Sequence, residues 1–322
     1  MKKILLAGGA GYIGTMLARE LIRRDYDVTI VDLLWFGNNL GEDSSKVKVI
    51  KKNIMELEKK DLEGFSSVVF LAGLSNDPMA EFSPATNFVE NSATPIYLAY
   101  IAKMAQVNRY VYASSCSVYG YTANKLMDEG AVLAPRYPYG ISKLIAEDAI
   151  MKLADEKFRP ICLRKGTVGG FSRRMRYDLV VNAMTKTALT EKKIVVNNPS
   201  LWRPLVDIRD IVSAYVRSIE SNQEVSGVYN ISYDNYTIGR LADEIKAELK
   251  ESGFDIKIQI KDIKDMRNYK VDNSKAKIEL DFVPKISPRK SVRSILENID
   301  LNDYDFTNKK YYNIQVFKEL VI

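Results

Sequence analysis

"GGAGYIG", residues 8–14, directly follows the apolar stretch "KILLA" (3–7) and precedes a stretch with apolar residues at helical spacing. Three of its four glycines, Gly8, Gly11 and Gly14, are spaced three residues apart. A glycine triplet alone is weak evidence, because tight turns and helix starts also contain glycine. With a strand before it and a helix after it, such a turn lets the backbone approach a pyrophosphate at the helix N-terminus. The stretch therefore predicts a dinucleotide site.

The first half of the chain repeats this alternation of short apolar runs and helical stretches. The runs are rich in Val, Ile or Tyr and end at turn residues, as strands buried on both faces do. They are residues 3–7, 27–32, 47–51, 67–72, 109–114 and 159–164. Helical spacing is found between them at 12–24, 87–106 and 140–157. The alternation predicts an α/β fold, a Rossmann-like doubly wound parallel sheet with helices on both faces.

The second expected strand ends in Asp32, 18 residues beyond Gly14. A carboxylate at this place accepts hydrogen bonds from the adenosine ribose and repels the 2′-phosphate of NADP. No arginine follows in "LLWFG" (33–37) to bind that phosphate. The sequence therefore predicts NAD as the cofactor.

Two further segments fit the same site. Asn53 could bond the adenine amino group while Ile54 packs on its face, although a strand-to-helix turn also explains the pair. Ala72 and Gly73 are small enough to let the backbone pass close to a cofactor, whereas Leu71 is also explained as a core residue. The expected cofactor residues of these motifs are Gly8, Gly11, Tyr12, Ile13, Gly14, Asp32, Asn53, Ile54, Leu71, Ala72 and Gly73.

The composition excludes several classes of function. The 322 residues contain no histidine, which excludes Ser-His-Asp and Cys-His catalysis and the usual zinc sites. Two cysteines cannot build a disulfide framework, and no stretch reaches the roughly 20 apolar residues of a membrane span. The net charge of +6 is spread in short groups beside acidic residues, as on a solvated surface. We therefore expect a cytoplasmic protein with neither a nucleic-acid nor a membrane partner.

From about residue 170 the pattern is less regular. Helices are expected at 180–193 and 237–253, the latter with a Thr N-cap signal, and strands at 204–208, 228–232 and 256–260. No linker separates the two halves. We expect a Rossmann domain over residues 1–168, with 206–235 returning to it, and a smaller C-terminal α/β substrate lobe formed by 169–205 and 236–322.

"YASSCSVYG" (112–120) ends the fifth expected strand, where ligands bind in such sheets. Ser115 can therefore place its hydroxyl at a substrate oxygen. Tyr139 and Lys143 of "YPYGISK" (137–143) are four residues apart and lie on one helical face. A phenol has an ordinary pKa of about 10, so it becomes a base at pH 7 only if nearby positive charge favours the phenolate. Each motif alone is weak evidence of catalysis. Together they predict that Ser115, Tyr139 and Lys143 form a catalytic set.

The ordered motifs resemble the NAD-dependent sugar-nucleotide epimerase/dehydratase family of extended short-chain dehydrogenases/reductases, whose best-known member is UDP-galactose 4-epimerase. They run from "GGAGYIG" through "LAGLS", Asn91, "SSCSVYG", "YPYGISK", "WRPLVDIRD" and "YNIS" to "VDNSKAKIELDF" and span nearly the whole chain. The resemblance implies that Tyr139 takes the proton of a sugar 4-hydroxyl, Ser115 holds the oxygen, and Lys143 bonds the nicotinamide ribose. It also adds Asn91, Tyr139 and Lys143 to the cofactor site and implies a homodimer.

The residues after Ser115 bear on which reaction follows oxidation at C4. Dehydratases of the family generally carry an acidic element there, whereas this chain has Cys116 and Ser117. Asp77 could supply an acid from elsewhere or could simply be a turn residue. A nucleotide-sugar 4-epimerase is therefore the first expectation. A 4-dehydrogenase or 4-ketoreductase is the alternative, and a 4,6-dehydratase or a non-catalytic NAD-binding regulator is less favoured.

On the substrate side, the resemblance implies a nucleotide-diphosphate sugar whose diphosphate is held by Arg203 and Arg267. Thr167 and Asp207 depart from the family's usual Asn and His, so an unusual sugar or nucleotide is expected. The cluster "SRRMRYD" (172–178) borders the sugar in this interpretation, although a solvated loop explains it nearly as well. The expected substrate residues are Asp77, Ser117, Thr167, Arg174, Arg176, Arg203 and Arg267.

Overall fold

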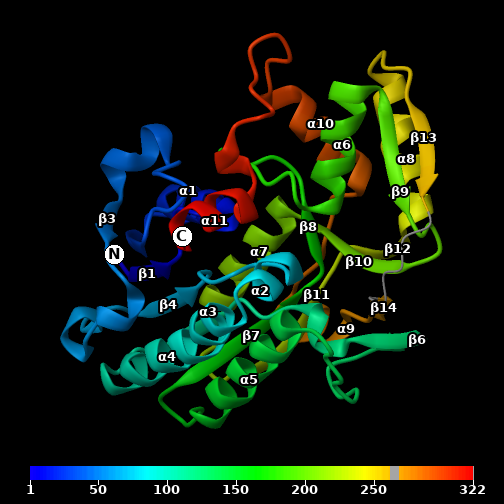
Figure 1. Cartoon of the computed structure of the whole chain (residues 1–322). Coiled ribbons are helices and arrows are strands. Elements are labelled where there is room, and N and C mark those ends of the chain that lie inside the picture. Colours follow the sequence, from blue (N-terminus) through cyan, green and yellow to red (C-terminus); the bar gives the residue numbers. More distant parts are fainter. Residues whose placement is uncertain (262–267, 322) are drawn as a thin grey trace.

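A computed structural model describes residues 1–261 and 268–321 of the chain. Seven strands form one parallel sheet in the order β3-β2-β1-β4-β5-β7-β11 (Figure 1). They are β1 (Lys3–Ala7), β2 (Asp27–Asp32), β3 (Lys48–Lys51), β4 (Ser67–Phe70), β5 (Arg109–Tyr112), β7 (Arg159–Lys165) and β11 (Gly227–Ile231). The chain runs outward from β1 to β3 and then returns to β4, so the strand order reverses between β1 and β4. Ligands bind at such a switch point, and the predicted Rossmann-like sheet is confirmed.

Helices cover both faces of this sheet. On one face, α1 (Tyr12–Arg23) packs against α7 (Ile208–Glu220), and their side chains share a core that includes Leu17 and Ile211. On the other, α4 (Thr94–Met104) packs against α5 (Pro138–Lys152) over a core that includes Leu98 and Ile150. The central strands are buried on both faces, which is why their sequences are continuously apolar rather than alternating.

The predicted helix at 87–106 is interrupted. The structure has α2 (Asp77–Phe82), α3 (Pro84–Phe88), a π-helical turn (Val89–Ala93) and then α4. A π turn inserts one extra residue, which rotates the following helix relative to the preceding one. The apolar spacing continues through the turn, so the pattern alone does not reveal it.

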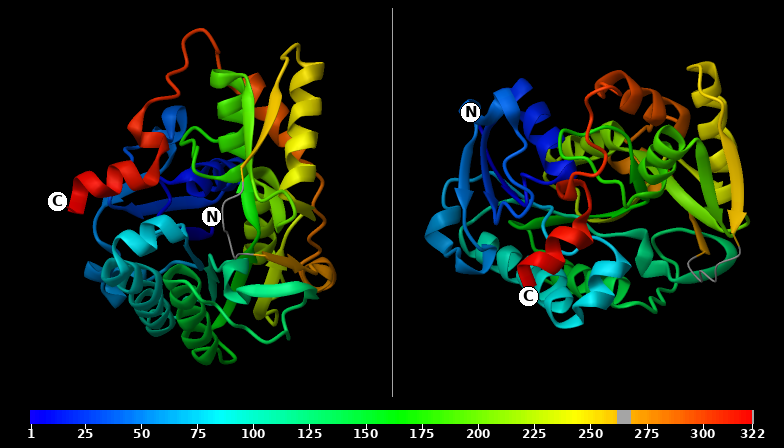
Figure 2. Two further views of the ribbon diagram at one scale, coloured as in Figure 1. Left: turned by 45° about the vertical axis from the view of Figure 1, so that its right-hand side comes forward. Right: turned by 45° about the horizontal axis from the view of Figure 1, so that its top comes forward.

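The second lobe lies to one side of the main sheet, coloured green to orange in Figure 2. Its core includes Leu205, Leu241 and Val292. Thr237 caps α8 by accepting a hydrogen bond from the Arg240 N–H at 3.2 Å, as its sequence signal predicts. The lobe contains β8 (Thr167–Gly169), β9 (Lys193–Asn197), β10 (Trp202–Asp207), β12 (Asp234–Thr237), β13 (Lys257–Lys261), α6 (Val180–Glu191), α8 (Ile238–Glu251) and α10 (Pro288–Asn298).

The predicted division into two domains stays a prediction. β11 pairs with β7 at the edge of the main sheet, which places residues 227–231 beside the Rossmann strands. The boundary between the predicted domains is less distinct near the C-terminus. There Phe282 and Ile295, from the predicted substrate lobe, share a core cluster with Leu17 of α1. Elements that the sequence analysis did not predict include the paired β6 (Tyr121–Met127) and β14 (Asn268–Val271), α9 (Ser274–Glu279) and α11 (Asn313–Val321), as well as β8, β9, β12 and α10 of the second lobe. In the described part of the chain, no helix is long and apolar enough to cross a membrane.

Candidate active site

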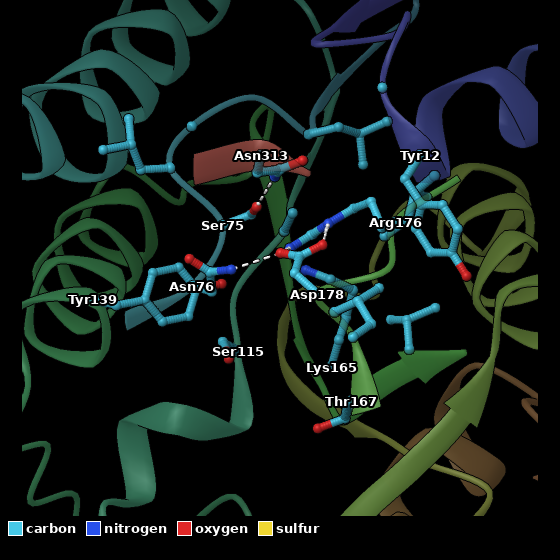
Figure 3. A pocket seen from close by; sticks show the side chains of 18 of the residues that line it. Tyr12, Ser75, Asn76, Ser115, Tyr139, Lys165, Thr167, Arg176, Asp178 and Asn313 are labelled. Atoms are coloured by element: carbon cyan, nitrogen blue, oxygen red, sulfur yellow. Dashed lines mark hydrogen bonds and ion pairs between the residues drawn. The ribbon is translucent and has the colours of Figure 1, made fainter. Parts of the chain in front are cut away.

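A cavity of about 680 Å³ opens at the carboxyl ends of the main-sheet strands and extends to the second lobe (Figure 3). The glycine loop, the end of β2 and the loop after β4 line one part of it. The end of β5, the start of α5 and residues of β8 and β10 line the other. One cavity therefore joins the expected cofactor residues to the expected substrate residues.

The glycine loop has the close packing that its sequence predicts. Gly8 has φ +81°, and a Cβ there would stand 2.5 Å from the backbone nitrogen of Ala72. A Cβ on Gly14 would stand 2.5 Å from the Gly9 carbonyl oxygen. Gly11 and Ile13 line the cavity at the N-terminus of α1. The loop can therefore present its backbone to a phosphate only as long as it lacks side chains at these points.

Tyr12 lies in this loop, but its hydroxyl forms hydrogen bonds with other groups of the protein. The hydroxyl donates to the Gly170 carbonyl oxygen at 2.6 Å and accepts from Nδ2 of Asn182 at 3.1 Å. Tyr12 thus fastens the loop to the segment that leads into the second lobe.

Asp32 faces the cavity from the end of β2. One carboxylate oxygen accepts from the Ala10 N–H at 3.0 Å and the other from the Leu34 N–H at 2.8 Å. Burial raises the pKa of this carboxyl group, and the two N–H donors partly offset that effect. Each oxygen keeps a lone pair for a ribose hydroxyl, so the geometry fits the role predicted for Asp32.

Asn53, Ile54, Leu71, Ala72 and Gly73 all line the cavity. The side-chain oxygen of Asn53 also accepts from the Met55 N–H at 3.0 Å. Asn53 is therefore both a turn residue and a cavity residue, and its proposed bond to adenine must use the remaining lone pair or its amide donors.

Asn91 lies behind the loop after β4 and is not among the side chains that line the cavity, so its expected contact with the cofactor stays a prediction. It is fully buried in the π turn, and its Nδ2 donates to the Leu74 carbonyl at 2.7 Å and to Oδ1 of Asn87 at 2.7 Å. A Cβ on Gly73 would stand 2.1 Å from Oδ1 of Asn91. Asn91 therefore positions the loop after β4 from behind.

Ser115, Tyr139 and Lys143 all line the cavity, at the end of β5 and in the first turns of α5. Oγ of Ser115 accepts from the Ser117 N–H at 3.2 Å and donates to Oγ of Ser117 at 3.1 Å. The Nζ of Lys143 lies 5.8 Å from the centre of the Tyr139 ring. The structure thus brings together the residue types that the sequence predicts as a catalytic set.

The pKa values of this set are shifted away from the catalytic ionisation state. Burial raises the pKa of Tyr139 to about 12, while hydrogen bonding to Ser115 lowers it, nearby Asp77 raises it and Arg176 lowers it. Burial, together with nearby Lys165, lowers the pKa of Lys143 well below its ordinary value. The protein side chains alone therefore favour a neutral phenol, and catalysis requires further positive charge at the site.

The second-lobe part of the cavity contains Thr167 and Arg203 beside the main-sheet residues Asp77 and Ser117. The guanidinium of Arg203 donates to the Trp202 carbonyl at 2.8 Å and lies 5.6 Å from the centre of the Tyr269 ring. Arg267, the second residue expected at the diphosphate, lies outside the described residues.

Arg174 and Arg176 both line the cavity. Nη2 of Arg176 bonds Oδ2 of Asp178 at 2.6 Å, and the same oxygen accepts from Nδ2 of Asn76 at 2.6 Å (Figure 3). This chain of contacts joins the loop after β4 to the 170–178 segment. The "SRRMRYD" cluster is therefore a built part of the cavity wall and not a solvated loop.

Two further residues that the sequence singled out have structural partners. The thiol of Cys116 is buried and donates to the Arg164 carbonyl oxygen at 3.1 Å, and Cys116 does not line the cavity. Asp207 caps α7 by accepting from the Arg209 N–H at 2.8 Å, and it also accepts from Oγ of Ser291 at 2.6 Å. Asp207 therefore has a capping role, and the unusual sugar or nucleotide expected from its departure from the family pattern stays a prediction.

Lys165 is a cavity residue that the sequence interpretation missed. It ends β7, forms a β-bridge with Ser115, and donates from Nζ to the Ser114 carbonyl oxygen at 2.8 Å. Burial lowers the pKa of its amine to about 7. Its place after the strand "RPICLR" is the signal that could have identified it, because strand ends in such a sheet face the ligand.

The cavity fits a dinucleotide on three features: a glycine loop at a helix N-terminus, a carboxylate at the end of β2, and a lining that includes both Asn53 and Tyr139. In the described ranges 1–261 and 268–321, no group of three or more Cys, Asp or Glu side chains could hold a metal ion. The fold and the cavity together define an enzyme of the dinucleotide-dependent Rossmann class.

The chain belongs to the NAD dependent epimerase/dehydratase family, whose model matches residues 4–232. NAD is therefore its cofactor, as Asp32 predicts. It is 26% identical over 312 residues to a UDP-glucose 4-epimerase of Lactobacillus helveticus, covering 88% of this chain and 92% of that enzyme. It is 24% identical over 299 residues to a probable UDP-arabinose 4-epimerase of Arabidopsis thaliana, covering 79% of this chain and 70% of that protein.

Two solved structures are also similar to this chain. MoeE5 in complex with UDP-glucose and NAD is 25% identical, with a TM-score of 0.78 over 92% of this chain and 97% of that one. The UDP-N-acetylglucosamine 4-epimerase of Methanobrevibacter ruminantium is 25% identical, with a TM-score of 0.81 over 92% of this chain and 99% of that one. The similarity therefore extends across both lobes.

Proposed function

We propose that the chain is a 4-epimerase of a nucleotide-diphosphate sugar, acting through a 4-keto intermediate. The observation that carries this proposal is the convergence of Ser115, Tyr139 and Lys143 on the cavity that also contains the glycine loop. The relatives named as 4-epimerases support it. Epimerisation at C4 needs only this catalytic set, a retained cofactor and room for the ketone to present its other face.

In this proposal Tyr139 accepts the proton of the 4-hydroxyl, and Ser115 holds that oxygen by a hydrogen bond. NAD, when bound, supplies the acceptor and then the donor of the hydride at C4. The positive charge needed to favour the phenolate comes from the oxidised cofactor, from Lys143 once it is protonated beside the phenolate, and from Arg176. Tyr139 returns its proton to the oxygen when the hydride comes back to the opposite face of the ketone.

Elimination is a second candidate because two ionisable side chains besides the catalytic set lie at the reacting end. Asp77 raises the pKa of Tyr139 by its charge. The amine of Lys165 has a pKa near neutrality. The carboxyl group of Asp77 and the amine of Lys165 are thus two groups that an elimination could use for proton transfer. Cys116, directly after Ser115, faces away from the cavity. A 4-dehydrogenase shares the oxidation at C4 with the epimerase and the dehydratase, but it releases the ketone.

We propose that Arg203 and Thr167 bind the diphosphate end of the substrate, with Ser117 nearer the sugar. Charge-assisted hydrogen bonds are worth about 1.5–3 kcal/mol each. Replacing Arg203 by Ala should therefore raise the dissociation constant of UDP at least about tenfold while leaving NAD binding unchanged. Unchanged UDP binding would place the diphosphate elsewhere.

The function can be tested by incubating the protein with UDP-, GDP-, dTDP- and CDP-sugars in deuterated water, with no added oxidant, and following them by proton NMR. A C4-inverted product without deuterium supports the 4-epimerase. Deuterium at C5 with loss of the 6-hydroxyl would show dehydration instead. A ketose formed only when an external hydride acceptor is present would show a dehydrogenase.

We further propose that the chain forms a homodimer through α4 and α5. These helices pack side by side and leave apolar side chains exposed at Tyr100, Met104 and Ile145. Sedimentation of the parent and of Met104→Glu would test this pairing.

We also propose that the enzyme works in the cytoplasm, because both cysteines are buried free thiols, as is usual in a reducing compartment.

A further inference from the structure

The guanidinium of Arg174 lies at the part of the cavity that contains the end of β2. Its central carbon is 3.8 Å from the centre of the Phe36 ring, and the charge of Asp32 acts on it. Asp32 is the residue expected at the adenosine ribose, and Phe36 lines the same cavity. The expectation that Arg174 borders the sugar therefore does not match its place.

The segment that contains Arg174 crosses the N-terminus of α1. Oγ of Ser172 donates to the Tyr12 carbonyl oxygen at 2.8 Å and lies 3.0 Å from Oγ1 of Thr15. The N-terminus of this helix is where a pyrophosphate binds in dinucleotide folds. Arg174, two residues further along, is thus placed close to that pyrophosphate.

Arg174 is 2% exposed, and burial lowers its pKa to about 9, so it remains a cation at neutral pH. Nη1 donates to the Met175 carbonyl oxygen at 3.3 Å and Nη2 donates to Oδ1 of Asn313. Among the residues that the structure describes, its Nε has no hydrogen-bond partner and its guanidinium has no salt bridge. A buried guanidinium is stable when an anion satisfies its remaining donors.

Asn313 connects Arg174 to the loop after β4. Its Nδ2 donates to Oγ of Ser75 at 2.7 Å, in the loop after β4 (Figure 3). Asn313 begins α11, which packs against α2. Phe317 of this helix lies 5.6 Å from the Trp35 ring and 6.0 Å from the Phe82 ring. The C-terminal helix is thus anchored at the same place as Arg174.

We propose that Arg174 binds the pyrophosphate of NAD and that Asn313, at the start of the C-terminal helix, holds the guanidinium in position. This inference rests on the proposed placement of the dinucleotide over the glycine loop. The C-terminal segment is then part of the cofactor site, because Asn313 bonds both Arg174 and Ser75.

The test is binding of three ligands, NAD, ADP-ribose and adenosine, to protein freed of copurified nucleotide. Arg174→Gln should weaken NAD and ADP-ribose at least about tenfold, because one charge-assisted contact is lost, and should leave adenosine unchanged. Arg173→Gln is the matched control, because Arg173 is only partly buried, donates to the Leu40 carbonyl and does not line the cavity. Asn313→Ala should act in the same direction as Arg174→Gln, with a smaller loss.

Several outcomes would overturn the inference. Equal losses for NAD and adenosine would indicate a structural role, and a loss for UDP but not for NAD would restore the sugar-side interpretation. If Arg174→Gln does not fold, Asn313→Ala decides by the same ligand comparison. If the parent binds UDP-sugars but no NAD, the proposed function fails as well, whereas NAD binding equal in parent and variants refutes only the role of Arg174.

Discussion

The Nζ of Lys143 lies close to two tyrosine rings, 5.8 Å from the centre of the Tyr139 ring and 5.0 Å from the centre of the Tyr112 ring. Lys143 is 3% exposed, and its burial lowers the pKa of the amine while burial of Tyr139 raises the pKa of the phenol. Both shifts disfavour charge, so the two groups are expected to ionise together. We therefore expect Lys143 to take up a proton when Tyr139 becomes a phenolate.

Tyr139→Phe should lower the turnover rate at least about a thousandfold, because the proton acceptor is lost while the ring is kept. NAD binding should be nearly unchanged. Tyr121→Phe, at an exposed position on β6, is the matched control. Steady-state rates and NAD titrations give both quantities, and a Tyr139→Phe rate within tenfold of the parent would show that another group is the base.

Asp32→Asn should reduce the preference for NAD over NADP by about tenfold or more, since it removes the charge that repels the 2′-phosphate. The amide keeps one acceptor for the N–H groups of Ala10 and Leu34, which limits the structural damage. Titration of both cofactors into parent and variant measures the effect. A parent that already binds NADP more tightly would contradict the role of Asp32.

Gly73→Ala should destabilise the protein much more than Gly64→Ala. Both glycines have positive φ, +113° and +81°, but an added Cβ meets Oδ1 of Asn91 at 2.1 Å only at Gly73. At Gly64 no atom lies within 4 Å of the added Cβ. We expect a cost of about 1 kcal/mol at Gly64 from backbone strain and about 3 kcal/mol or more at Gly73. Urea denaturation measures both, and equal costs would contradict the described packing.

Lys165→Met should stabilise the protein more at pH 7 than at pH 10. The pKa of Lys165 is about 7 in the folded protein and about 10.4 when unfolded, so the unfolded chain binds more protons between these values. Parent stability therefore gains from this group as pH rises from 7 to 10, and the methionine removes that gain. Because Lys165 is only partly buried, we expect a difference of about 1–2 kcal/mol.

Lys59→Met, at an exposed surface position, should show no such pH dependence and is the control. Denaturation curves of the parent and both variants at the two pH values check the prediction. A stabilisation by Lys165→Met that is equal at pH 7 and pH 10 would mean that the lysine is not desolvated.

The main sheet could be predicted from the sequence, and so could the position of Ser115, Tyr139 and Lys143 at one cavity. The sequence patterns that indicate them lie within short stretches of the chain. Strands buried on both faces are continuously apolar, and Asp32 and Tyr139 stand at fixed distances from a strand end or a neighbouring Lys. The place of Asn91 was harder to predict, because chain position does not reveal which way a side chain points and the π turn changes the helical phase at that residue.

Other features depend on contacts between residues distant in sequence. β6 pairs with β14 through Tyr121 and Asn268, and neither segment has a strong strand pattern of its own. Asp207 caps a helix and bonds Ser291, and no sequence spacing indicates that contact. The same holds for Asn313, which meets Arg174 and Ser75 only in the folded chain.

The central claim is that the hydride removed from C4 returns to C4 of the same sugar. The most direct measurement uses a UDP-sugar that carries deuterium at C4, incubated with the protein in ordinary water without added cofactor or oxidant and followed by proton and deuterium NMR. The proposal predicts a C4-inverted product that keeps the deuterium at C4, formed over many turnovers per enzyme. Loss of the C4 label, accumulation of a ketose, or a proton exchanged at C5 together with loss of the 6-hydroxyl would contradict it.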